Sequence, residues 1–208
     1  RDVYLLKRPA TMLWDYFVHT KLGQGSATVQ VEPKPMAEDT AVAVSLYDSA
    51  NQLVATATAT ESEDGTFDQV AELIVPEPKL WNAEQPNLYT LVLETAGETI
   101  VDHVGLREIC IKDCVVYIND APVKFYGVNR HESDPVTGYT VGIDQMKREM
   151  QLLKAHNFNG IRTSHYPNRS EWYFMCDQEG IYMMDETNLE SHGSWQKGMT
   201  VSPDWNVP

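Results

Sequence analysis

The stretch "GIDQMKREMQLLKAHNFNGIRTSHY", residues 142–166, decides how the second half of the chain folds. Apolar side chains at Ile143, Met146, Met150 and Leu153 recur at helical spacing, and the charged residues between them lie mostly off that face. The segment "GIRTSHY" at 160–166 then has the composition of a strand. The pattern therefore predicts an amphipathic helix of about three turns followed by a strand.

The flanking sequence extends this pattern in both directions. A strand-like "KFYGVN" at 124–129 precedes the helix. A second helix is expected from an N-cap at Ser170 to Gly180, followed by the strand "IYMMDETN" at 181–188. Strands and helices that alternate with short connections predict a parallel sheet with right-handed crossovers. Three strands cannot close a barrel, so this half of the chain looks unfinished.

The first half of the chain has a different period. Short β-rich runs alternate with proline, glycine and other turn residues as far as about residue 120, which is typical of a β-sandwich. Val42, Val44 and Leu46 share one face of a predicted strand, and Ala43 and Ser45 share the other. We expect sandwich aromatics such as Trp14, Trp81 and Tyr89 to serve packing rather than to form a carbohydrate platform.

Composition limits the function classes. The 208 residues carry a formal charge of -14, which disfavours nucleic acid and anionic membranes as partners. No apolar run approaches the roughly 18 residues that a membrane-spanning helix needs. The three cysteines have no metal-like spacing, so they are expected to be reduced, buried thiols. The chain starts at Arg1, so a leader of the native protein would not be visible in it.

Titratable residues gather where the three α/β strands should end. These ends read "NRHESD" (129–134), "RTSHYPN" (162–168) and "DETNLESHG" (185–193), and parallel α/β folds place their chemistry at carboxyl ends of strands. Asp185 and Glu186 are adjacent, so they should point to opposite faces and make a poor acid–base pair. Glu190 and His192 are two apart and could reach one cation; a surface salt bridge is the alternative.

These stretches, together with "FYGVNRHESDPVTGYTVG" (125–142), "PKLWNAEQPNLYTLVLE" (78–94) and "VGLREI" (104–109), resemble the large bacterial β-galactosidases of glycoside hydrolase family 2. The resemblance runs along nearly the whole chain. It implies that residues 1–110 form an immunoglobulin-like β-sandwich. It also implies that residues 111–208 form the first three βα units of an incomplete (β/α)8 TIM barrel.

The resemblance assigns roles to individual residues. His131 and His165 match histidines that contact the sugar, and His165 counts with Arg162 among the catalytic positions. Arg162 matches the arginine that steadies the nucleophilic carboxylate, a task suited to a fixed guanidinium fork. Glu190 and His192 match two ligands of the family's active-site Mg2+, with Mn2+ as the alternative ion.

The implied activity is retaining hydrolysis of terminal β-D-galactosides such as lactose by a parent protein, expected to be a homo-oligomer of the bacterial cytoplasm. That mechanism needs two carboxylates about 5 Å apart, and both are expected beyond residue 208. The isolated chain should therefore be inactive. The alternatives are a β-glucuronidase or β-mannosidase of the same family, and a non-catalytic carbohydrate-binding or scaffold module.

Overall fold

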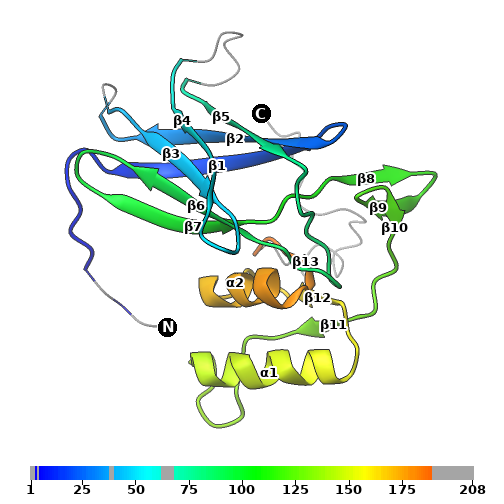
Figure 1. The fold of residues 1–208 in the computed structure, drawn as a ribbon. Helices are drawn as coiled ribbons and strands as arrows, with labels where there is room; N and C mark the ends of the chain where they lie inside the picture. Colours follow the sequence, from blue (N-terminus) through cyan, green and yellow to red (C-terminus); the bar gives the residue numbers. More distant parts are fainter. Residues whose placement is uncertain (1–2, 4, 38–39, 62–67, 189–208) are drawn as a thin grey trace, which may run out of the picture. The chain divides into compact units, whose positions relative to one another are not determined.

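A computed structural model describes residues 3, 5–37, 40–61 and 68–188 (Figure 1). Its contacts divide the chain into two compact units. One unit comprises Asp2–Lys124 with Asp177–Gly180, and the other comprises Phe125–Cys176 and the chain from Ile181 onward. Each unit is described by itself.

The first unit contains a sandwich of two antiparallel sheets, with strand orders β1-β2-β5 and β4-β3-β6-β7. This is an immunoglobulin-like arrangement in which the fourth strand lies in the second sheet. Residues 3, 5 and 6, which precede the first strand, are not in a strand. The seven strands are β1 (Leu13–Leu22), β2 (Ser26–Pro35), β3 (Ala43–Tyr47), β4 (Leu53–Thr58), β5 (Ala71–Pro76), β6 (Tyr89–Glu94) and β7 (Thr99–Val104).

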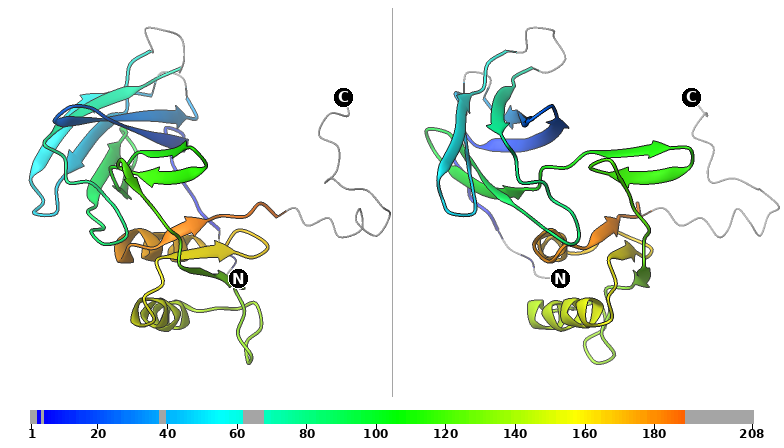
Figure 2. Two further views of the ribbon diagram at one scale, coloured as in Figure 1. Left: turned by 90° about the vertical axis from the view of Figure 1, so that its right-hand side faces the viewer. Right: turned by 45° about the vertical axis from the view of Figure 1, so that its right-hand side comes forward.

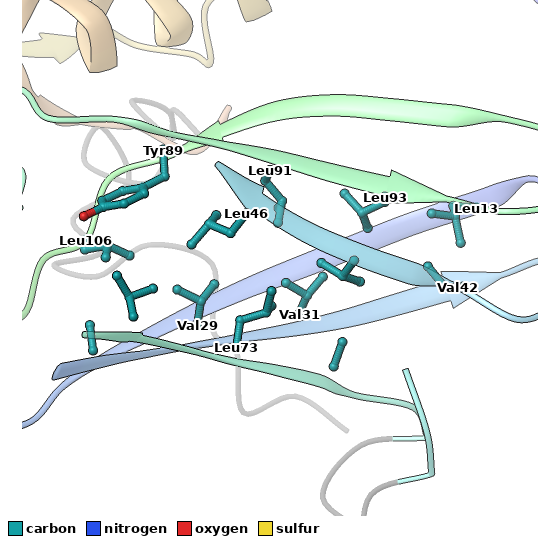
Figure 3. Packing of buried hydrophobic residues seen from close by; sticks show 14 residues of the cluster. Leu13, Val29, Val31, Val42, Leu46, Leu73, Tyr89, Leu91, Leu93 and Leu106 are labelled. Carbon is teal, nitrogen blue, oxygen red and sulfur yellow. The ribbon is translucent and has the colours of Figure 1, made fainter. Parts of the chain in front are cut away.

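Alternating apolar residues fill the space between the two sheets, as the sequence pattern predicts. Val44 and Leu46 on β3 are fully buried, and Leu91 on β6 is buried beside them. Figure 3 shows Leu46 and Leu91 on the side of their sheet that faces Val31 and Leu73 of the other sheet. Burial of such side chains stabilises a fold by about 1.5–3 kcal/mol each, so this core accounts for a large share of the sandwich's stability.

Two expectations about single residues need qualification. Trp81 and Tyr89 are buried, as packing residues should be, but Trp14 is 69% exposed on β1. Cys176 is buried, whereas Cys114 is exposed, so the prediction of three buried thiols is wrong. Cys114 lies in the turn between β8 (Ile109–Lys112) and β9 (Val115–Ile118), and its φ of 61° is in the left-handed region rather than the extended one. A short strand β10 (Ala121–Pro122) completes this small antiparallel sheet.

The second unit has the predicted alternation of strands and helices (Figure 2). Its elements are β11 (Gly127–Arg130), α1 (Ile143–Ala155), β12 (Gly160–Thr163), α2 (Ser170–Glu179) and β13 (Tyr182–Met184). The strands form a parallel sheet in the order β11-β12-β13. Of the three expected βα units, two have both strand and helix, and the third is represented by its strand alone within the described residues. The described strands do not close a barrel.

Both helices contribute to one apolar cluster with the middle strand. Met146 and Met150 of α1, Trp172 and Cys176 of α2, and Ile161 of β12 are all buried in it. Ile143, expected on the same helical face, is 42% exposed because it begins the helix. No helix in the described part of the chain is long and apolar enough to span a membrane.

A buried cation ties the end of β11 to its surroundings. The Arg130 side chain is only 7% exposed, and its Nε donates to Glu149 Oε2 of α1 at 2.8 Å. Its guanidinium also donates to Asn168 and lies 3.7 Å from Glu132 Oε1. The guanidinium stacks 3.9 Å from the Trp172 ring centroid, a cation–π contact. One side chain thus links β11, α1, α2 and the loop that follows β12.

Substitution of Arg130 tests how much this cation contributes to the stability of the α/β unit. Arg130→Met should lower the free energy of opening of the α/β unit by about 3–5 kcal/mol, because Glu132 and Glu149 lose their counter-charge. Native-state hydrogen exchange of the α1 amides measures that free energy. The matched control is Arg148→Met, which makes the same change on the exposed face of α1 and should alter it by less than about 0.5 kcal/mol. Equal effects of the two variants would contradict the assignment.

A carboxylate clamp in the sandwich gives a pH prediction. Glu98 Oε1 accepts from Arg8 Nη2 and from the Leu13 backbone N–H, both at 2.6 Å. The Arg8 hydrogen bond holds the pKa of Glu98 below its ordinary value of 4.5. A carboxylate with a lowered folded-state pKa contributes stability above its unfolded pKa and loses it as the pH falls through the folded one.

We therefore expect the urea midpoint of the chain to fall as the pH drops below 4.5, and to fall less in Glu98→Gln. Arg8→Gln should flatten the profile in the same way, and the double variant should flatten it no further. Far-UV circular dichroism follows the unfolding. Profiles of Glu98→Gln and wild type that run parallel below pH 4.5 would rule out the clamp as a source of acid sensitivity.

Candidate functional site

Parallel pairing brings the three predicted strand ends to one edge of the sheet. Arg130 at the end of β11 pairs with Thr163 at the end of β12, and Arg162 pairs with Met184 at the end of β13. The residues that come directly after these strands therefore lie close together, although they are far apart in sequence. The structure brings four residues of these ends together: His131, Arg162, His165 and Glu186.

The two histidines are in contact. Their ring centroids lie 5.2 Å apart at an interplanar angle of 76°, an edge-to-face arrangement. His131 is exposed and His165 is partly exposed, so both rings are open to a ligand. The ring centroids of Tyr166 and His131 lie 6.3 Å apart, and those of Tyr139 and Tyr166 lie 6.5 Å apart in an edge-to-face arrangement. These rings make an aromatic wall beside the strand ends, a surface suited to the apolar face of a sugar.

Arg162 is the centre of the polar contacts. Its Nη2 lies 2.6 Å from Glu186 Oε2 and 3.3 Å from His165 Nδ1, and its Nη1 donates to Asn129 Oδ1 at 3.3 Å. The guanidinium is thus held by one partner from each strand segment: Asn129 lies within β11, His165 follows β12 and Glu186 follows β13. It presents positive charge at the edge where the histidines lie, an arrangement that can bind and orient an anionic oxygen.

Asp185 and Glu186 have separate partners, as expected for adjacent residues on an extended backbone. Asp185 Oδ1 accepts from Thr163 Oγ1 at 3.0 Å and from the Tyr173 hydroxyl at 2.6 Å. Burial, with the Asp185 hydrogen bond, raises the pKa of Tyr173 to about 12. Tyr173 therefore keeps its proton at neutral pH and remains a donor to the carboxylate.

Residue-by-residue reading of the sequence found only part of this arrangement. It singled out His131, Arg162 and His165 but did not assign partners to Thr163, Tyr173 or Asn129. Arg130 and Glu132 form an ion pair at the strand ends, and both residues are buried.

The predicted metal ligands, Glu190 and His192, lie outside the described residues. Among the residues that the structure describes, no group of three or more histidine, cysteine or carboxylate side chains could hold a metal ion. The Mg2+ assignment therefore remains a prediction.

Comparison with protein families matches the chain in two adjacent parts. Residues 11–107 match the description "Glycosyl hydrolases family 2", and residues 109–208 match "Glycosyl hydrolases family 2, TIM barrel domain". The second match starts at the β8–β9 hairpin and includes all three strand ends described above.

Individual relatives give the same result. The β-galactosidase of Halalkalibacterium halodurans is 37% identical over 100% of this chain, which covers 21% of that protein. The β-galactosidase of Actinobacillus pleuropneumoniae is 41% identical over 93% of the chain and 19% of its own length. The β-galactosidase large subunit of Latilactobacillus sakei is 41% identical over 100% of the chain, which covers 34% of that subunit. The chain thus spans about a fifth to a third of these relatives.

Solved structures of β-glucuronidases share the fold. That of Dictyoglomus thermophilum has a TM-score of 0.75 at 28% identity, with 84% of this chain and 29% of that chain covered. The Ruminococcus gnavus enzyme in complex with D-glucuronic acid has a TM-score of 0.76 at 30% identity, with 85% and 30% covered. Two family matches that together span nearly the whole chain, and relatives aligned along its full length, show that it belongs to family 2 of the glycosyl hydrolases.

Proposed function

We propose that the chain is part of a retaining β-galactosidase that hydrolyses terminal non-reducing β-D-galactosides such as lactose. The observation that carries the proposal is the convergence of His131, His165 and Arg162 at one sheet edge, in a chain that is 37–41% identical to curated β-galactosidases. In this proposal His131 and His165 hydrogen-bond the sugar hydroxyls, and Arg162 steadies the nucleophilic carboxylate.

The remaining parts of the mechanism belong to the parent protein. Retaining hydrolysis requires a carboxylate nucleophile and a carboxylic acid about 5 Å apart. Asp185 is tied to Thr163 and Tyr173, and Glu186 is tied to Arg162, so neither is placed for that work. We propose that both catalytic carboxylates come from other parts of the parent and that this chain alone does not hydrolyse glycosides.

Glu190 and His192 are proposed as two ligands of a Mg2+ or Mn2+ ion in the parent. An ion there would add positive charge near the sugar and its leaving group. A further proposal is that the parent assembles as a homo-oligomer in the bacterial cytoplasm. Nucleic acid and membranes are not proposed as partners, because the charge of -14 repels phosphates.

A β-glucuronidase is the second candidate, because the similar solved structures are β-glucuronidases. Charge favours the neutral sugar. Arg130 is buried and paired with Glu149, and Arg162 is assigned to the nucleophilic carboxylate in this proposal, so neither guanidinium is available to a uronate. Higher identity to β-galactosidases than to these β-glucuronidases supports the same choice.

The test compares aryl β-galactoside, β-glucuronide and β-mannoside hydrolysis by the parent protein, with the 208-residue chain as the inactive control. Only the galactoside should be cleaved well, and chelation of divalent cations should slow the reaction. His165→Ala should lower kcat/KM by about 100-fold, the order expected when a hydrogen bond to the transition state is lost.

The matched control is His156→Ala, which removes an exposed histidine whose Nδ1 lies 2.9 Å from Leu152 O at the end of α1. It should leave kcat/KM unchanged. Faster cleavage of the glucuronide than of the galactoside would overturn the proposed substrate, and hydrolysis by the 208-residue chain itself would overturn its proposed inactivity.

A further inference from the structure

Glu186 makes the shortest described contact of Arg162, yet it lies outside the set of residues to which a role has been given. We propose that Glu186 is a positioning residue, which fixes the Arg162 guanidinium so that it holds His165 in one tautomer with the hydrogen on Nε2. The inference rests on the proposed function for its catalytic consequence, but the tautomer itself can be measured without any substrate.

The Glu186 side chain is placed by both its charge and its backbone. Its Oε2 lies 2.6 Å from Arg162 Nη2, in an ion pair that lacks the geometry of a hydrogen bond. Its backbone N–H donates to Thr163 Oγ1 at 2.9 Å, and Thr163 is fully buried on β12. Thr163 in turn donates to Asp185, which also accepts from Tyr173. Glu186 is therefore anchored at the level of Arg162 before any ligand arrives.

The donors and acceptors determine the state of His165. A guanidinium can only donate, so in the 3.3 Å contact between Arg162 Nη2 and His165 Nδ1 the imidazole nitrogen must accept. The hydrogen of the neutral ring then resides on Nε2. The alternative, in which Nδ1–H donates to Glu186, is disfavoured because Glu186 Oε2 lies 3.6 Å from Nδ1, beyond a normal hydrogen bond. Glu186 thus acts on His165 through Arg162.

The consequence is a directed donor at the site. With Nδ1 occupied by Arg162, the Nε2–H of His165 is the ring's remaining hydrogen-bonding group and can donate to a sugar hydroxyl. If Glu186 is lost, the guanidinium loses its strongest restraint, and both tautomers become populated. The ring would then offer an acceptor where the substrate needs a donor. A buried or partly buried polar group that is wrongly paired costs more than a missing contact.

The direct test is the imidazole nitrogen spectrum of His165 in the 15N-labelled 208-residue chain, recorded at alkaline pH with the signal assigned by His165→Gln. Wild type should show one tautomer, protonated on Nε2. Glu186→Ala should give a mixture, and so should the isosteric Glu186→Gln, which keeps the shape of the side chain but loses the charge that pairs with Arg162.

The matched control is Glu171→Ala, which removes a carboxylate of α2 that pairs with Arg169 at 2.9 Å. It should leave the His165 signal unchanged. An Nδ1–H tautomer in wild type, or an unchanged spectrum in Glu186→Ala, would overturn the inference. Circular dichroism of each variant shows whether the fold is retained, and Glu186→Gln keeps the test valid if the alanine variant does not fold.

The kinetic test uses the parent enzyme. Glu186→Ala should lower kcat/KM about 10-fold to 100-fold, as expected when a catalytic group is displaced slightly. In Arg162→Ala the further change Glu186→Ala should have no effect, because Glu186 acts only through Arg162. Additive losses would indicate a general structural role instead.

The tautomer measurement and the kinetic test distinguish the proposed function from the proposed role of Glu186. A parent that cleaves no galactoside, together with the expected tautomer spectra, would reject the proposed function and retain the positioning role. Galactoside cleavage with a tautomer that does not respond to Glu186→Ala would retain the function and reject the role of Glu186.

Discussion

The buried guanidinium of Arg130 is the interaction on which the arrangement of the α/β unit depends. A cation that is 7% exposed is tolerated only when carboxylates and acceptors surround it. Glu149, Asn168 and Glu132 supply them, each from a different segment, and Trp172 covers the face of the guanidinium. The segments that carry these partners are thereby fixed around the end of β11, immediately before His131.

The strand ends form a second layer of polar contacts on this base. Thr163 and Arg162 are neighbours on β12, so their side chains point in opposite directions and recruit different carboxylates from the chain after β13. Thr163 binds Asp185 on the buried side, and Arg162 binds Glu186 beside the histidines. The "DE" pair is therefore not one site with two acids but a structural acid followed by one that faces the ligand side.

The sandwich and the α/β unit illustrate two ways in which a sequence encodes a layer. In the sandwich, strict alternation on β3 buries Val44 and Leu46 and leaves their neighbours partly exposed, because one face of each sheet meets solvent. In the α/β unit the strands are only three or four residues long, and the helices supply most of the core through Met146, Met150 and Trp172. The candidate site lies in the second unit, where short strands place several loops at one edge.

The sequence by itself determined the two-part organisation, the order of strands and helices in the α/β unit, and the candidate residues His131, Arg162 and His165. The organisation and the order of elements follow from local period, which a linear pattern contains, whereas the three site residues follow from their place near strand ends together with the resemblance to family 2 β-galactosidases. Only the tertiary structure decided that Arg130 and Glu132 are buried, that Cys114 is exposed, and that Glu186 rather than Asp185 pairs with Arg162. The physical reason is that partners such as Arg162 and Glu186 are brought together by strand register and by packing across the sheet, and neither is visible in residue spacing along one chain segment.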